Sequence, residues 1–265
     1  MFLKKRHIGL FIITFTLVLA SCSGYEKLLK SSDYKLKFEK SVEYYEDGDY
    51  VRASRLLDQI ASMYRGTTKA DTVYYYQAYS YFHQRDYILG GHHFANLAGN
   101  YPNSAFAEEA DFMTGYCFYM QSPRPSLDQD NTINAIAAFQ VFIISYPSSR
   151  RVADAHKFIT ELQDKLVEKS YLSAKLYYDL GDYKASIIAL RNSLNEYPET
   201  KHREELMYLI LRSNFLLASN SILSKQKERF QSAVDEYYSF ISEFPESKYR
   251  RDADRIYENS MVYLN

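Results

Sequence analysis

Tyr101-Pro102-Asn103-Ser104 is a short phrase that the chain repeats in four related forms. The other copies are Tyr146-Pro147-Ser148-Ser149, Tyr197-Pro198-Glu199-Thr200 and Phe244-Pro245-Glu246-Ser247. Proline lacks an amide hydrogen and clashes with the preceding turn, so each copy is expected to end a helix. The Ser or Thr two residues later can accept a hydrogen bond from the free N–H groups that open the next helix. The phrase therefore predicts a chain of helical repeats.

The residues upstream of each proline follow a common pattern. A small residue lies twelve positions before the proline, and bulky residues lie eight and five positions before it, with Ser193 as the weakest fit. The sets are Gly90, Phe94 and Leu97; Ala135, Phe139 and Phe142; Ser186, Leu190 and Ser193; and Ala233, Tyr237 and Phe240. An earlier copy has Ala53, Leu57 and Ile60, with Arg65 where the proline would be. Small residues allow helices to cross closely, so these positions predict the core of each repeat.

The pattern resembles tetratricopeptide repeats, in which a small residue of the first helix is followed three later by an aromatic one. The matching pairs are Ser41 with Tyr44, Ala78 with Tyr81, Gly115 with Phe118, and Ala174 with Tyr177. In the second helix a Tyr precedes a small residue, as in Tyr50 with Ala53, Tyr87 with Gly90, and Tyr183 with Ser186. The resemblance implies an all-α fold: a right-handed solenoid of about five helix pairs with a C-terminal capping helix.

The spacing of the repeats departs from the usual period of about 34 residues. The four prolines, at 102, 147, 198 and 245, are 45, 51 and 47 residues apart. We expect an additional helix between Ser149 and about Lys165, and a cap over Ser247–Leu264. The predicted organisation is residues 33–147 for repeats 1–3 and 148–265 for repeats 4–5 with the cap.

The composition fits a mostly helical chain and excludes some functions. The 265 residues are 46% hydrophobic, with only nine Gly and six Pro, and the formal net charge is −1. No basic stripe dominates, which argues against nucleic-acid binding. The motifs HExxH, GxSxG, GxxxxGK[ST], GxGxxG and CxxC do not occur, so we expect no enzyme activity and no cofactor besides a covalent lipid. The adjacent His92 and His93 point in different directions on a helix and predict no metal site.

The N-terminus has the features of a lipoprotein signal peptide over residues 1–21. A positive start, Lys4-Lys5-Arg6, precedes the apolar run Ile8–Ala20, which is shorter than the ~20 residues of a membrane span. The run ends in Leu19-Ala20-Ser21-Cys22, which resembles a bacterial lipobox and implies acyl chains on Cys22. The alternative is an ordinary signal peptide with a chance cysteine. Residues 22–32 are then a lipidated tether, and Cys117 is expected to be a buried small hydrophobic residue.

Ser23 follows the cysteine, where an Asp resembles an inner-membrane retention signal in some bacteria. We therefore expect the protein to be anchored to the outer membrane by its lipid and to face the periplasm.

Aromatic residues cluster at three positions of the first helix in repeats 1–3. These positions lie three before, one after and four after the small residue. In the fifth repeat the same positions are Ile210, Asn214 and Leu217. A groove lined by rigid rings suits extended or amphipathic peptides, although such rings can also pack between repeats as core. The predicted peptide-binding groove consists of Phe38, Tyr45, Tyr75, Tyr79, Phe82, Phe112, Tyr116 and Tyr119.

Two arginine pairs, Arg150-Arg151 and Arg250-Arg251, lie near helix starts, where the helix dipole disfavours positive charge. They are candidates for contact with a partner.

The repeats behind a lipobox, with the Ala-containing helix starts Ala105-Phe106-Ala107 and Arg150-Arg151-Val152-Ala153, resemble the outer-membrane assembly lipoprotein family BamD, formerly YfiO. The resemblance implies a non-enzymatic scaffold and substrate receptor in the machinery that inserts β-barrel proteins into the outer membrane. It further implies binding to the periplasmic domains of the barrel-forming core subunit and to unfolded β-barrel substrates. The alternative is another periplasmic repeat lipoprotein that scaffolds cell-wall or envelope enzymes.

Overall fold

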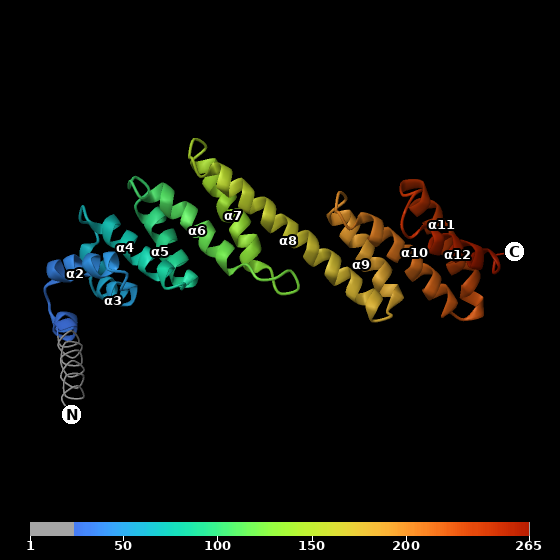
Figure 1. Cartoon of the computed structure of the whole chain (residues 1–265), viewed down its shortest axis with the longest axis horizontal. Coiled ribbons are helices and arrows are strands. Elements are labelled where there is room, and N and C mark those ends of the chain that lie inside the picture. Colours follow the sequence, from blue (N-terminus) through green and yellow to red (C-terminus); the bar gives the residue numbers. More distant parts are fainter. Residues whose placement is uncertain (1–23, 265) are drawn as a thin grey trace, which may run out of the picture. The chain divides into compact units, whose positions relative to one another are not determined.

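The computed structural model describes residues 24–264, and the predicted lipidation site Cys22 lies outside them. The described residues are helical apart from short turns and loops, so the all-α prediction is confirmed (Figure 1). The helices are α2 (Tyr34–Glu46), α3 (Tyr50–Ile60), the short η1 (Ala61–Tyr64), α4 (Ala70–His83), α5 (Tyr87–Asn100), α6 (Ala107–Gln121), α7 (Asp130–Ser145), α8 (Val152–Asp179), α9 (Tyr183–Glu196), α10 (Arg203–Ser219), α11 (Leu223–Glu243) and α12 (Arg250–Met261).

The chain forms two compact units. Unit 1 comprises the chain up to Ser122 together with Asn131–Ile159, and unit 2 comprises Pro123–Asp130 and Thr160–Asn265. Within unit 1 each helix from α2 to α6 packs on the next. Within unit 2 α10 packs against α9 and α11, and α12 closes on α11 and α10 as the predicted cap. Five helix pairs and a final helix therefore follow one another along the described chain.

The turns between the two helices of three repeats each contain a residue with a positive φ. Gly48 and Gly181 have φ of +79° and +77°, the left-handed region that favours glycine. Arg85 takes the same place in the turn between α4 and α5 with φ of +62°. The aspartate that follows accepts a hydrogen bond from a backbone N–H of the next helix, as Asp49 does from Arg52 and Asp182 from Ala185. These are side-chain caps of α3 and α9, the second helices of their pairs.

The repeated phrase ends one helix and fixes the start of the next, as predicted. Its Ser or Thr hydroxyl accepts a bond from the amide two residues later, at 3.1 Å for Ser104 and 2.9 Å for Ser247. Three of these hydroxyls also donate to a carboxylate near the start of the first helix of the repeat that the phrase ends. The pairs, each 2.6 Å apart, are Ser104 with Asp71, Ser149 with Glu108, and Ser247 with Glu204. The phrase therefore joins neighbouring repeats as well as punctuating helices.

The predicted core positions are buried. Phe94, Phe139 and Phe240 are completely inaccessible to solvent. The small residue Gly115 lies against Phe139, and a Cβ added there would meet the ring at 2.9 Å. Cys117 is 1% exposed, which confirms the prediction for it, and burial raises the pKa of its thiol to about 12.

Two segments differ from the sequence prediction. Residues 24–30, predicted as part of a tether, are helical, and Tyr25 is buried with its ring 5.6 Å from that of Tyr44. The additional helix expected between Ser149 and Lys165 does not end there but continues to Asp179 as the single helix α8. No glycine or proline interrupts that stretch, so nothing in the backbone stops the helix.

Across residues 24–264 no helix is long and apolar enough to cross a membrane.

Candidate functional site

The eight predicted groove residues lie in unit 1 on α2, α4 and α6. Those of α4 and α6 form a continuous series of ring contacts, which Tyr76 extends to Phe38 and Tyr45 of α2. We call these eight residues the aromatic row. Tyr75 lies 4.8 Å from Tyr79 between ring centroids, and Tyr79 lies 6.2 Å from Phe82. Phe82 reaches α6 through Tyr116, at 6.0 Å. Tyr116 in turn lies 5.7 Å from Tyr119 and 6.3 Å from Phe112. Sequence positions one helix pair apart thus meet in space, as the pattern predicts.

The members of the aromatic row differ in exposure. Phe112 is 3% exposed and packs on Phe139 and Phe142 at 5.6 Å and 5.4 Å. It belongs to the core and offers no face to a ligand, so its assignment to a groove is wrong. The other seven are half-buried, which leaves part of each ring accessible. Partial burial fixes a ring's orientation while leaving apolar area for a partner.

Tyr79 is tied to α6 by its hydroxyl, which donates to the carboxylate of Glu109. Burial and then this bond raise the pKa of Tyr79 well above its usual value, so the phenol stays protonated. Arg151 pairs with the same carboxylate at 2.7 Å, and its guanidinium carbon lies 4.4 Å from the centroid of the Phe112 ring. Arg151 therefore serves unit 1 itself, and its assignment as a partner contact is not supported by this geometry.

Of the other three arginine candidates, one is bound within its own unit and two are exposed. Arg250 pairs with Asp254 at 2.7 Å and donates to the Pro245 carbonyl at 3.1 Å, so it holds the start of α12. Arg150 and Arg251 are exposed. Only Arg150 and Arg251 among the four keep their predicted availability for a partner.

Four further aromatic residues lie beside the aromatic row, and the sequence analysis did not identify them. Tyr76 bridges α2 and α4, at 5.1 Å from Tyr45 and 6.5 Å from Phe38. His83 stacks on Tyr50 at 4.5 Å and approaches the Tyr45 hydroxyl at 3.3 Å. Phe106 lies 4.4 Å from Tyr75, and Phe158 of α8 lies 4.5 Å from Tyr119. Tyr76 and His83 were detectable, since they lie next to row residues in α4, whereas Phe158 comes from a distant helix.

A second repeated contact joins each phrase to the helix before it. The side chain two positions after the Ser or Thr of each phrase packs on an aromatic ring of the first helix of the repeat that the phrase ends. In the first four repeats this ring lies three positions before the small residue of that helix. The pairs are Phe106 on Tyr75, Arg151 on Phe112, His202 on Tyr171, and Tyr249 on Tyr208. The earlier copy has Lys69 at 5.6 Å from the Phe38 ring. We call this contact the inter-repeat clasp.

The clasp shows that the sequence pattern was assigned out of register in the fifth repeat. Ile210, Asn214 and Leu217 were expected at the three lining positions. Ile210 and Asn214 are 2% and 7% exposed, and Tyr208 takes the clasp position instead. The pattern points to Ser213 as the small residue, but its hydroxyl bonds to Ser186 of α9 at 3.0 Å. Ser213 packs against the previous repeat and is not equivalent to the small residue of the other repeats. The equivalent position is Leu211, three residues after Tyr208.

No group of three or more His, Cys, Asp or Glu side chains that could hold a metal ion occurs in the part of the chain that the structure describes. His92 is bonded to Asn96 at 2.9 Å, and His93 stacks on Tyr81 at 5.1 Å.

Comparison with known proteins gives a consistent result. The chain matches the family model described as YfiO, outer membrane lipoprotein, over residues 31–228 and again over 171–265. It is 26% identical over 236 residues to a putative outer membrane protein assembly factor BamD of Aquifex aeolicus, covering 88% of this chain and 76% of that protein. It is 21% identical over 237 residues to the BamD of Pasteurella multocida, covering 84% and 89%.

A solved structure, the complex of the TPR2AB domain of yeast Sti1 with pHSP90, aligns with a TM-score of 0.38 at 11% identity. The alignment covers 87% of this chain and 99% of that one. The two family matches together span the chain from residue 31 to its end, and the chain therefore belongs to the YfiO family of outer membrane lipoproteins.

Proposed function

We propose that this chain is a non-enzymatic assembly factor that acts as scaffold and substrate receptor where β-barrel proteins are inserted into the outer membrane. Family membership supports the location at the outer membrane. The names of the relatives from Aquifex aeolicus and Pasteurella multocida support the role in outer membrane protein assembly.

The observation that carries the receptor role is the continuity of the aromatic row. Five half-buried rings of α4 and α6 follow one another with centroids 4.8 to 6.2 Å apart, and Tyr76 links the rings of Phe38 and Tyr45 in α2 to this series. Ordered rings bind an extended peptide at low entropic cost. The resemblance to the family implies a substrate signal that ends in an aromatic residue and a carboxylate, and aromatic side chains of such a peptide can stack on the row.

The scaffold role falls to unit 2 in this proposal. Its repeats would bind the periplasmic domains of the barrel-forming core subunit, with the exposed Arg251 as one contact. Arg150 lies in unit 1 and would serve a partner bound beside the phrase at Tyr146-Pro147-Ser148-Ser149. Exposed guanidinium groups suit bidentate pairing with carboxylates.

Peptide binding tests the receptor role. A fluorescent peptide that ends in phenylalanine with a free carboxylate is titrated with the full chain in mild detergent. Tyr75→Ser and Tyr119→Ser should each weaken binding at least about tenfold, which is about 1.4 kcal/mol. Tyr177→Ser and Tyr238→Ser, exposed tyrosines of unit 2, are the matched controls and should leave the affinity unchanged. Equal loss in both pairs, or unchanged binding after the row substitutions, would contradict the receptor role.

A further inference from the structure

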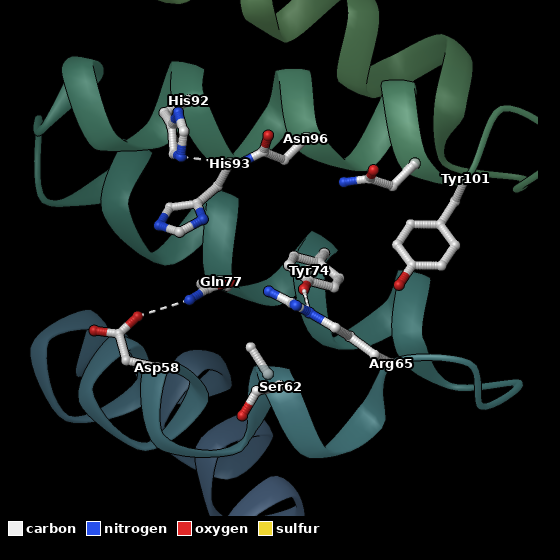
Figure 2. A pocket seen from close by; sticks show the side chains of 11 residues that line it. Asp58, Ser62, Arg65, Tyr74, Gln77, His92, His93, Asn96 and Tyr101 are labelled. Atoms are coloured by element: carbon white, nitrogen blue, oxygen red, sulfur yellow. Dashed lines mark hydrogen bonds between the residues drawn. The ribbon is translucent and has the colours of Figure 1, made fainter.

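A polar cavity of about 620 Å³ lies in unit 1 between α3, α4 and α5 and is lined mostly by residues outside the aromatic row (Figure 2). Its lining includes Asp58 of α3, Gln77 of α4, and His93 and Asn96 of α5, with Arg65 at one end. In Figure 2 the imidazole of His93 projects from α5 toward Gln77 and Asp58. The cavity is far larger than a single water molecule, which occupies about 30 Å³ of liquid.

Two buried polar atoms of this cavity have no protein partner among the described residues. They are Oε1 of Gln77 and Nδ1 of His93. Gln77 is 4% exposed, so its side chain is nearly withdrawn from solvent. Buried polar groups in folded proteins are almost always hydrogen-bonded, and an unpaired one lowers stability. Two such atoms in one cavity therefore point to a ligand that pairs with both.

Neighbouring side chains hold both groups in place. Gln77 Nε2 donates to Asp58 Oδ1 at 2.7 Å, and a carboxylate can only accept, so the other amide atom, Oε1, is left as an acceptor. The Tyr81 hydroxyl donates to Asp58 Oδ2 at 2.6 Å, which fixes the carboxylate. The Tyr81 ring also stacks on His93 with their planes 15° apart. Asp58 and Tyr81 thus orient the two unpaired atoms, as supporting residues do in a preorganised binding site.

The charges around the cavity favour a neutral polar ligand. Asp58 and Arg65 contribute opposite charges, so neither an anion nor a cation is favoured overall. Burial lowers the pKa of His93, which keeps its imidazole neutral at pH 7. A neutral imidazole offers one donor and one acceptor nitrogen, and Gln77 offers an acceptor. An amide group, with its N–H donor and carbonyl acceptor, is the complement to this set.

We propose that this cavity binds an amide group presented by a polypeptide, either in its backbone or on an Asn or Gln side chain, with Gln77 Oε1 and His93 Nδ1 as its partners. The amide N–H donates to Gln77 Oε1, and the amide carbonyl oxygen accepts from His93 in its Nδ1–H tautomer. The rings of Tyr74 and Tyr101, 5.6 Å apart, supply apolar surface beside the polar atoms. This inference does not depend on the proposed function, because it uses a different set of side chains.

Nuclear magnetic resonance of the full chain in mild detergent, labelled with ¹⁵N-histidine, tests the proposal. The probes are N-methylacetamide for the amide, acetate for an anion and methylammonium for a cation. We expect N-methylacetamide to shift the ring resonances of His93 in a saturable way at millimolar concentration, and the two ions to shift them at least tenfold less. No saturable shift, or equal shifts with acetate, would overturn the proposal and leave a cavity filled by water or ions.

Two variants separate binding from folding. Gln77→Met keeps the volume of the side chain but removes the acceptor, and should weaken binding of N-methylacetamide at least tenfold. Asp58→Asn changes an exposed residue that positions Gln77 and Tyr81, and should weaken binding severalfold while the melting temperature stays close to that of the parent. His83→Gln, beside the aromatic row and outside the lining of the cavity, is the matched control and should bind as the parent does. Unchanged binding in both Gln77→Met and Asp58→Asn would refute the assigned contacts.

Discussion

The ring of Tyr249 lies flat on that of Tyr208, with centroids 4.1 Å apart and planes 4° apart. The same arrangement joins His202 to Tyr171 at 3.9 Å and 6°. In both places the residue that opens one repeat covers the first helix of the repeat before it. The inter-repeat clasp thus places the contact between repeats next to the phrase that ends each repeat, so that helix termination and repeat docking depend on the same few residues.

Removal of one clasp should destabilise unit 2. Tyr249→Ala loses the stacked ring and is expected to lower the free energy of unfolding by about 2–3 kcal/mol, combining lost apolar burial with lost stacking. Tyr249→Phe retains the ring and should cost less than about 0.5 kcal/mol, since the Tyr249 hydroxyl is not part of the stack. Urea unfolding followed by circular dichroism measures both. Equal losses in the two variants would show that the hydroxyl, and not the stack, carries the contact.

The helix order and core were predictable from the sequence because they depend on local signals. Proline, the Gly-Asp-Tyr turn and the spacing of Phe94, Phe139 and Phe240 all act within one helix pair. The register of the fifth repeat was not predictable, because Ser213 and Leu211 both stand in plausible places and only the packing on α9 distinguishes them. The continuity of α8, by contrast, was predictable, because no glycine or proline interrupts residues 152–179.

The candidate site was predictable in part. Helical periodicity places the aromatic row on one face, but it cannot tell a ring that faces solvent from one that a distant helix covers. Phe112 is covered by Phe139 and Phe142 of α7, and Tyr119 by Phe158 of α8. The cavity with Gln77 and His93 is formed by three helices, and no motif in the sequence marks it.

Gly115 should tolerate no side chain. A Cβ there would stand 2.9 Å from the fully buried Phe139 ring, so Gly115→Ala forces two packed helices apart. We expect a loss of about 1–3 kcal/mol in the free energy of unfolding. Gly99→Ala in α5 is the matched control, because a Cβ there meets nothing within 4 Å. It should instead stabilise the protein by about 0.5 kcal/mol through helix propensity. Thermal unfolding that ranks the two variants the other way would contradict the close crossing of α6 and α7.

Unit 1 should lose stability as the pH falls below about 6.5. Burial lowers the pKa of His83 and of His93 in the folded chain, so the unfolded chain binds more protons in this window. Stability is therefore present above the unfolded value of about 6.5 and declines as the pH drops through it. Urea midpoints at pH 7.5 and 5.5 measure the effect. The double variant His83→Phe, His93→Phe should flatten the dependence, whereas His92→Phe at an exposed position should not. An unchanged slope in the double variant would assign the pH dependence to other groups.

Membrane attachment should depend on Cys22. Cys22→Ala removes the residue expected to carry the acyl chains, and the protein should move from the washed membrane fraction to the soluble fraction. Cys117→Ala is the control, since Cys117 is buried in α6 and should leave the attachment unchanged. Immunoblotting of fractions after a high-salt wash, which removes proteins held by partners through charge, decides the result. Retention of Cys22→Ala after that wash would contradict lipid as the sole anchor.

Identification of the partners tests the central claim most directly. The tagged protein is purified from native membranes in mild detergent, and the proteins that accompany it are identified by mass spectrometry. The proposed assembly function predicts near-stoichiometric recovery of a β-barrel protein that carries periplasmic domains. Recovery of cell-wall enzymes without such a barrel protein would contradict the assembly function and favour a scaffold for envelope enzymes.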